Sequence, residues 1–200
     1  MSPRTCTFVL QIMRLNHPKL VKLLKTAYSA EKAASLAYIG HAKSVKNTEH
    51  KIAIKQIELD EWEHRAEVLK IMEQYAIPVS KWLEFKFYII GQTIAASCFV
   101  IGKFMPYYFA GVLESGNVCE YFVMMKYFRS LGITEHDEIL YEMAIKEKEH
   151  EGFYLQAVED NGSLPLFEKL FGWGKVKKKN DVDFENLKTV EQSDDYCNLE

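Results

Sequence analysis

Two Glu-x-x-His pairs constrain this 200-residue chain more than any other feature. Glu61 and His64 lie in one predicted helix, and Glu147 and His150 lie in another. Residues three apart in a helix share a face, and in both helices that face is otherwise apolar. The sequence therefore places carboxylate and imidazole groups where a hydrophobic core is expected.

Apolar residues recur at three- and four-residue intervals along most of the chain, which predicts an all-α protein. Helices are expected at Pro18 to about Val45, Thr48 to about Tyr75, Glu135 to about Val158 and Leu164 to Trp173. A long apolar segment from Ser80 to about Phe128 lies between the second and third of these. Pro106 should kink or divide this segment, because proline lacks an amide hydrogen and clashes one turn back.

Two further glutamates join the pattern. Glu31 lies on the apolar stripe of the first helix, between Ala27 and Ala34, and Glu114 lies in line with Tyr121 in the long apolar segment. Four buried carboxylates without matching buried lysine or arginine would cost many kcal/mol. Two divalent ions would balance them. One glutamate from each of two helices plus Glu-x-x-His from two others is the ligand set of di-iron carboxylate bundles.

This ligand set predicts a ferritin-like four-helix bundle with a long apolar third segment and an extra short C-terminal helix. Its oxygen-rich coordination suits iron or manganese better than a closed structural zinc site. We expect residues 18–174 to form the di-iron domain, after an N-terminal segment, 1–17. Residues 175–200 are charged and poor in large apolar groups, which predicts a mobile tail.

Composition argues against several other classes of protein. The formal net charge of −3 at pH 7 disfavours a nucleic-acid binder, which usually presents a basic face. The four cysteines include no Cys-x-x-Cys pair, so a zinc ribbon or a rubredoxin-type iron centre is not expected. Cys98 and Cys119 lie in apolar stretches and are expected to be core thiols of a protein in a reducing, intracellular compartment.

With these residues placed, the sequence from about Leu20 to Trp173 resembles the demethoxyubiquinone hydroxylase family, the di-iron monooxygenases of ubiquinone biosynthesis. The resemblance is most specific in the two Glu-x-x-His pairs, in the spacing of the four glutamates and in the apolar, glycine-containing segment from Ile90 to Lys103. It implies a hydroxylase that uses O₂ and two iron ions on a quinone-like apolar substrate. An external reductant such as NADH would supply the electrons.

By this resemblance, six residues hold the two irons. One iron would be bound by Glu31, Glu61 and His64, and the other by Glu114, Glu147 and His150. Glu61 and Glu147 would bridge the pair, and Tyr121 would match a family tyrosine on the metal-facing side, with a plain core tyrosine as the alternative. Glu120 stands where a histidine is typical of the family, and Ser115 stands where a second glutamate is common. These departures leave the ligand set complete and the substrate and reductant open.

The family's fold also implies peripheral contact with the inner face of a membrane. The apolar run from Phe87 to Gly102 has 16 residues, fewer than the roughly 20 that span a bilayer. Together with Leu164 to Trp173 and the lysines that follow, this run could form a membrane-facing surface. A buried core helix beside a solvated lysine run is the alternative.

Two other functions remain open, and so does homo-oligomerisation. A ferritin- or rubrerythrin-like protein for iron handling or peroxide reduction would bind iron with the same residues. Cage-forming ferritins lack a counterpart of the long apolar segment, and rubrerythrins usually carry a separate cysteine-rich iron site. A metal-free helical scaffold that binds a membrane or a partner would keep its stability and metal content in Glu61→Ala or His150→Ala. A hydroxylase of a tRNA base is disfavoured by the absence of a basic stripe.

Overall fold

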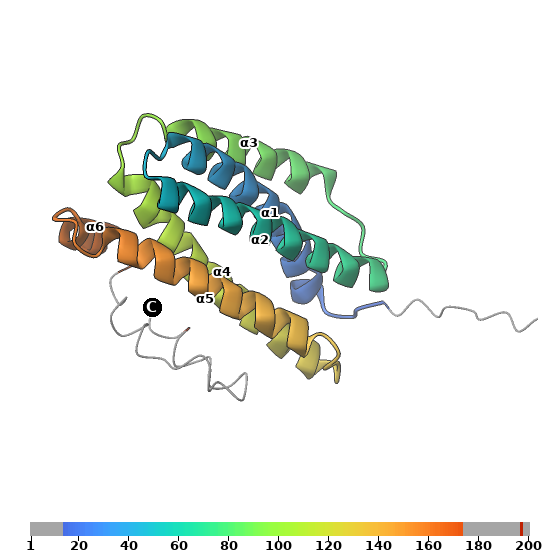
Figure 1. Cartoon of the computed structure of the whole chain (residues 1–200). Coiled ribbons are helices and arrows are strands. Elements are labelled where there is room, and N and C mark those ends of the chain that lie inside the picture. The colour runs from blue at the N-terminus through green and yellow to red at the C-terminus, as the bar shows by residue number, and fades with distance from the viewer. Residues whose placement is uncertain (1–13, 174–196, 198–200) are drawn as a thin grey trace, which may run out of the picture.

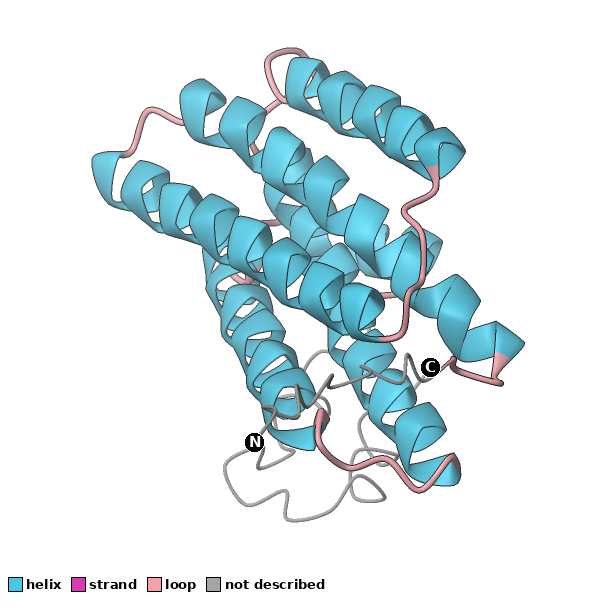
Figure 2. Ribbon diagram, turned by 90° about the vertical axis from the view of Figure 1, so that its right-hand side faces the viewer, coloured by secondary structure: helices cyan, strands magenta, loops and turns pink. Residues whose placement is uncertain are grey.

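The computed structural model describes residues 14–173 and Cys197, and every regular element in these residues is a helix (Figure 1, Figure 2). The elements are α1 (Pro18–Ser44), α2 (Thr48–Gln74), α3 (Lys81–Ser97), α4 (Phe104–Ser130), α5 (Asp137–Val158) and α6 (Leu164–Phe171). The predicted all-α fold is confirmed. Residues 1–13, 174–196 and 198–200, which include nearly all of the expected tail, lie outside the described residues.

The four longest helices α1, α2, α4 and α5 form a bundle of two pairs. α1 packs along α2, α4 packs along α5, and the two pairs face each other across the core (Figure 1). Short loops, 45–47 and 131–136, join the partners within each pair, as in antiparallel bundles. α3 stands outside the four and packs along α1.

Capping side chains help to fix where the first three helices begin. His17, Asn47 and Ser80 each accept a hydrogen bond from the backbone N–H three residues further on, at 3.0, 3.0 and 3.3 Å. Each bond satisfies one of the first-turn N–H groups that a helix leaves without a partner. Pro18 occupies the start of α1, where its missing amide hydrogen costs nothing.

The long apolar third segment is divided into two helices, which is one of the two outcomes that the sequence left open. α3 ends at Ser97 and α4 begins at Phe104, so the break falls ahead of Pro106 instead of at it. Gly102 has a φ of 83°, a left-handed conformation that glycine adopts without steric cost. Pro106 then sits in the first turn of α4, where no amide hydrogen is needed. Among the described helices, none has the length and apolar character needed to cross a bilayer.

α3 lies against α1 along small residues. A Cβ on Gly40 would lie 2.4 Å from Cα of Ala95, and a Cβ on Gly91 would lie 2.7 Å from the carbonyl oxygen of Ala33. Glycine is required at both positions because any side chain there would collide with the facing backbone. The seam brings the two helix axes close together and leaves room elsewhere along α3 for a cavity.

A partly buried carboxylate ties α3 to the first helical pair. Glu84 of α3 accepts hydrogen bonds from both guanidinium nitrogens of Arg65, at 3.1 and 2.8 Å, and from Nζ of Lys32, at 3.1 Å. Ser29 adds a hydroxyl at 2.9 Å. Because charge-assisted and bidentate hydrogen bonds are the stronger kind, this group fixes α3 against α1 and α2.

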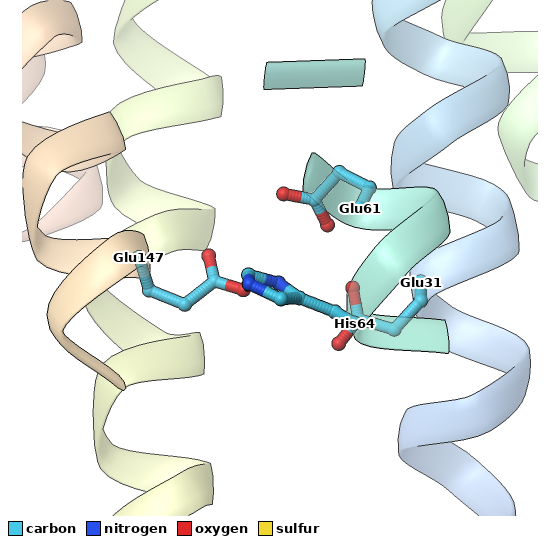
Figure 3. Close-up of side chains that lie close together, drawn as sticks. All are labelled: Glu31, Glu61, His64 and Glu147. Carbon is cyan, nitrogen blue, oxygen red and sulfur yellow. The ribbon is translucent and has the colours of Figure 1, made fainter. Parts of the chain in front are cut away.

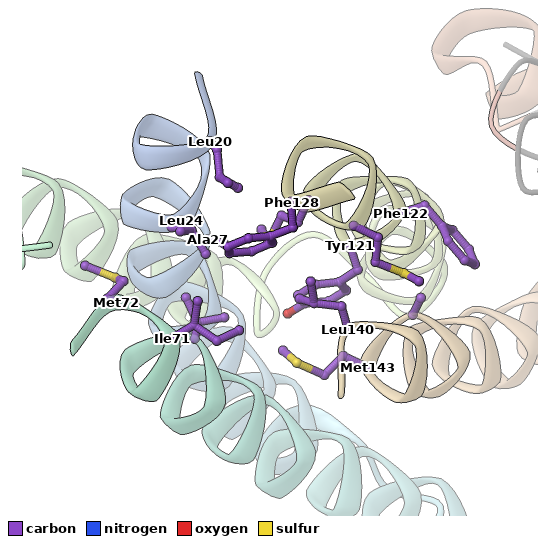
Figure 4. Packing of buried hydrophobic residues seen from close by; sticks show 14 of the residues in the cluster. Leu20, Leu24, Ala27, Ile71, Met72, Tyr121, Phe122, Phe128, Leu140 and Met143 are labelled. Atoms are coloured by element: carbon purple, nitrogen blue, oxygen red, sulfur yellow. The ribbon is translucent and has the colours of Figure 1, made fainter. Parts of the chain in front are cut away.

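The apolar core consists of two clusters, one toward each end of the bundle. One includes Leu24, Val68, Phe128 and Leu140, drawn from α1, α2, α4 and α5, and Figure 4 shows much of this cluster. The other includes Ile54, Ile57, Tyr108, Tyr154 and Trp173. In α2 the second cluster precedes Glu61 and His64 and the first follows them. Glu61, His64 and the other predicted polar residues therefore form a layer between the two apolar clusters.

Cysteine pairing differs from the expectation at one position. Cys98 is a buried free thiol, as predicted. Cys119 forms a disulfide with Cys197, so the prediction of a core thiol at Cys119 is wrong. The partner lies 78 residues away, and nothing in the local apolar pattern around Cys119 indicates such a distant bond.

Candidate metal centre

The six predicted ligands come from four helices and meet in the middle of the bundle. Two groups of potential ligand atoms form there, each with its atoms within 4.8 Å of one another. One group is Glu31, Glu61, His64 and Glu147, and the other is Glu61, Glu114, Glu147 and His150. Figure 3 shows the first group, with Glu147 reaching from α5 toward side chains of α1 and α2. Glu61 and Glu147 belong to both groups, so the two positions share two carboxylates.

All six side chains are buried. Glu61, Glu114 and Glu147 are 0% exposed, and the other three are at most 5% exposed. Among the described residues, no lysine or arginine forms an ion pair with any of the four carboxylates, whose only ionic neighbours are the two histidines. This arrangement concentrates negative charge at a point from which water is excluded, which costs free energy unless a cation enters.

Unsatisfied atoms in the cluster fit a bound cation. Both carboxylate oxygens of Glu61, one oxygen each of Glu31 and Glu147, and Nδ1 of both histidines make no hydrogen bond of good geometry among the described residues, although Nδ1 of His64 lies 2.9 Å from Oε1 of Glu147. Buried polar atoms are rarely left unpaired in folded proteins. Here they converge, and each is a lone-pair donor of the kind that divalent metals bind. The residues present therefore fit one or two metal ions.

The orientation of His150 follows from a residue outside the ligand set. Nε2 of His150 lies 3.0 Å from Oδ2 of Asp60, while Nδ1 faces Glu61 at 3.4 Å and Glu147 at 3.8 Å. A carboxylate on the far ring nitrogen is the usual support of a metal-binding histidine, because it fixes the tautomer and the ring plane. His64 presents Nδ1 to the same cluster, 2.9 Å from Oε1 of Glu147.

The protonation of the cluster reflects this crowding. Burial raises the pKa of Glu61 and Glu114 well above the usual range, and the charge of Glu147 raises both further. Burial also raises the pKa of Glu31. Burial acts in the same direction on Glu147, but Glu114 and the two histidines outweigh it and hold the pKa of Glu147 below its ordinary value. Without a cation the cluster holds protons in its place, and metal loading must release them.

Two tyrosines bind the two glutamates that are not shared. Tyr121 donates a hydrogen bond to Oε1 of Glu31, as its predicted metal-facing position allows. Tyr38 donates to Oε1 of Glu114 in the same way. Sequence reasoning missed Tyr38, although it lies seven residues after Glu31 and therefore on the same face of α1. It also missed Asp60, which lies next to Glu61 and looks like an ordinary surface residue in the sequence.

Glu120 and Ser115, the two positions that differ from the family the sequence resembles, lie close to the cluster. Glu120 is half-buried, and burial raises its pKa, as do the charges of Glu31 and Glu147. It belongs to neither metal-binding group of the described residues. Ser115 is 3% exposed and follows Glu114 in α4. Neither departure interrupts the six-residue set.

A pocket beside the cluster has a nearly apolar wall. Its volume is about 380 Å³, and its lining includes Ala34 and Tyr38 of α1, Ile90 and Ile94 of α3, and Phe109 and Leu113 of α4. We call it the apolar pocket. Tyr38 is in its wall and also bonds to Glu114, so one side chain separates the pocket from the carboxylate cluster.

Comparison with protein-family models, curated proteins and solved structures finds no match to this chain. The class is therefore defined by the molecule itself: an all-helical bundle whose core holds buried glutamates and histidines able to bind a metal ion.

Proposed function

We propose that this chain is a ferritin-like, O₂-dependent hydroxylase with two iron ions that acts on a quinone-like or other apolar substrate. The observation that supports it most is the pair of overlapping Glu/His groups that share Glu61 and Glu147. Two positions with shared carboxylates suit a pair of ions a few ångströms apart. Four carboxylates and two imidazoles favour iron or manganese over a closed zinc site.

Each part of the cluster has a role in this proposal. Glu31 and His64 would hold one ion, Glu114 and His150 would hold the other, and Glu61 and Glu147 would serve both. When bound, the iron pair supplies the activation of O₂. Asp60 holds the ring of His150 in its binding orientation, and Tyr121 holds the carboxylate of Glu31. The burial of all six side chains keeps bulk water away from the cluster.

The apolar pocket supports an apolar substrate. Its wall has few polar groups that could bind a polar molecule. Tyr38, which donates a hydrogen bond to Glu114, is part of this wall. Hydroxylation would insert one atom of O₂ into a carbon–hydrogen bond and release the other as water. The two electrons that this requires would come from an external reductant such as NADH.

The outer face of α3 supports peripheral contact with a membrane. Trp82, Phe85 and Ile89 are 69, 60 and 47% exposed, and Lys81 and Lys86 lie among them. Exposed aromatic residues beside lysines are typical of segments that rest in the interfacial region of a bilayer. The same helix forms one wall of the apolar pocket, so an apolar substrate could pass from the lipid to the pocket without crossing water.

Iron counting and product analysis test the proposal together. Protein loaded anaerobically with ferrous iron and freed of excess should hold about two irons per chain. Glu61→Ala should lose iron, while Glu63→Ala, an exposed neighbour in α2, should keep it. The loaded protein should then hydroxylate a short-tailed demethoxyquinone or another apolar compound with NADH and O₂. Fully loaded protein that consumes peroxide and yields no organic product would instead support the iron-handling alternative.

A further inference from the structure

A second pocket adjoins the apolar one where α1 ends and α2 and α4 begin. Its volume is about 400 Å³, and we call it the head pocket. Its polar wall includes His41, Lys46, Asn47, His50, Lys103 and Asn161, together with Ser44 and Tyr107. Three residues, His41, Cys98 and Pro106, line both pockets, so the two spaces meet at these side chains.

The head pocket is electropositive. Lys46 and Lys103 line it, His50 adds an imidazole, and no aspartate or glutamate lines it. Neither lysine forms an ion pair within the part of the chain that the structure describes. Unneutralised cations around a concave space attract an anion.

Two helix N-termini add to this field. α2 begins at Thr48 and α4 at Phe104, and the residues at both starts line the head pocket. The N-terminal end of a helix carries a partial positive charge and N–H groups without intrahelical partners. No side chain caps α4, so the N–H groups of Phe104 and Met105 are available to an oxyanion, while Pro106 in the same turn offers none.

A buried imidazole stands between the two pockets. His41 is 3% exposed and packs against the rings of Tyr107 and Tyr154, with centroids 4.6 and 5.9 Å away. Its Nε2 has no hydrogen-bond partner among the described residues. Burial, together with the charge of His50, lowers the pKa of His41 to about 4. The ring is therefore neutral at pH 7 and can hydrogen-bond to a ligand without carrying charge.

We propose that the two pockets together bind an amphipathic anion. The carboxylate or phosphate monoester of this molecule occupies the head pocket between Lys46, Lys103 and the start of α4. Its alkyl chain lies in the apolar pocket and runs along α1, past His41, toward Tyr38. This inference rests on the proposed function in one respect only, namely that the alkyl chain of the ligand would be the part that is oxidised. Binding of the ligand itself needs no metal.

Isothermal titration of the metal-free protein with decanoate, decyl phosphate and decanol tests the proposal. The anions should bind at least tenfold more tightly than the alcohol. In the series from hexanoate to decanoate, affinity should rise by about fourfold per methylene, as expected for apolar burial. If only one anion binds tightly, the head group is identified as carboxylate or phosphate. Equal affinity for decanol and both anions, or no dependence on chain length, would overturn the proposal.

Paired charge variants locate the head group. Lys46→Gln/Lys103→Gln should reduce the affinity for the anions at least tenfold and leave that for decanol unchanged. Lys19→Gln/Lys22→Gln is the matched control, because it removes the same charge from exposed lysines at the other end of α1. Equal losses in both double variants would refute the head pocket as the anion site. Iron content, measured separately on each variant, should stay at the wild-type value, so failure of anion binding is distinguishable from failure of the di-iron site.

Discussion

Asp60 Oδ2 lies 3.0 Å from Nε2 of His150, and the opposite ring nitrogen of that histidine faces two buried glutamates. One side chain of α2 thus orients a potential metal ligand of α5 across the bundle. The contact has no counterpart in the sequence pattern, because Asp60 lies beside the apolar stripe of α2 and not on it.

We expect Asp60→Asn to weaken metal binding by roughly 10- to 100-fold, because the histidine loses the carboxylate that fixes its ring and raises its basicity. Competition titrations of ferrous or cobalt ion against a chelator would measure this. Glu63→Gln removes the same charge from an exposed position nearby and should leave affinity unchanged. A wild-type affinity in Asp60→Asn would mean that the contact is structural only.

We expect Glu61→Leu to abolish metal binding and yet stabilise the metal-free protein. Both oxygens of Glu61 are buried without a hydrogen-bond partner among the described residues, and burial raises the pKa of this group well above normal. A buried carboxyl without a hydrogen bond costs free energy even when it is protonated, and replacing buried ionisable groups by apolar residues of similar volume can add about 1–4 kcal/mol to the free energy of unfolding. Urea unfolding in the presence of a chelator measures this change. Destabilisation would show that the cluster is held together without metal.

We expect Gly91→Ala to destabilise the bundle by about 1–3 kcal/mol, because the new Cβ would lie 2.7 Å from the carbonyl oxygen of Ala33. The matched control is Gly116→Ala in α4, where a Cβ meets nothing within 4 Å. There the better helix propensity of alanine should stabilise by about 1 kcal/mol. Thermal unfolding of both variants gives the comparison, and a neutral Gly91→Ala would contradict the close approach of α1 and α3.

We expect the hydrogen bonds and ion pairs of Glu84 with Arg65, Lys32 and Ser29 to stabilise the protein in a pH-dependent way. Burial favours the neutral form of Glu84, but Arg65, Lys32 and Ser29 outweigh it and lower its pKa below 4.5. A lowered carboxyl pKa contributes stability that is present above about pH 4.5 and is lost as the pH falls through the folded-state value. Glu84→Gln should cost about 2 kcal/mol at pH 7.

The loss in Glu84→Gln should shrink as the pH falls below 4.5, because the wild type then loses the same interaction. Urea unfolding at a series of pH values measures both proteins. A cost that is the same at pH 3.5 and pH 7 would show that packing of the side chain, and not its charge, holds α3 in place.

We expect Trp82→Ser/Phe85→Ser to reduce binding to anionic lipid vesicles at least tenfold, because both side chains are more than half exposed on α3. Vesicle co-sedimentation measures the change. Ile52→Ser/Leu59→Ser removes two exposed apolar side chains from α2 and is the control. Equal losses in both double variants would mean that binding is non-specific and that α3 is not the membrane-facing element.

Helical periodicity predicted the helices themselves and which of their residues face the core. It placed the bounds of α1, α2, α5 and α6 within a few residues, and it put six polar residues on inward faces that the structure brings together. The reason is that three- and four-residue spacing determines which side chains share a face, whatever the partner helix is. Burial of glutamates along such a face is therefore visible before any tertiary contact is known.

Features that depend on contacts distant in sequence were not predictable in this way. The break between α3 and α4 covers residues 98–103, including Gly102 with its φ of 83°, and not Pro106, where the local pattern placed it. Tyr38 binds Glu114, a residue 76 positions later, and Cys119 bonds to a residue 78 positions later. No local pattern carries that information. The ligands and Tyr121 followed from one helix at a time, whereas Asp60 and the bond from Tyr38 to Glu114 did not.

The position of α3 outside the four ligand-bearing helices has a consequence for engineering. α3 supplies none of the six predicted metal ligands but forms a wall of the apolar pocket. Substitutions at Ile90 or Ile94 can therefore change the length and width of the molecules that fit, without altering the groups that could hold a metal. In the proposed function, the choice of substrate can then be altered through α3 alone, although α1 and α4 also line the pocket.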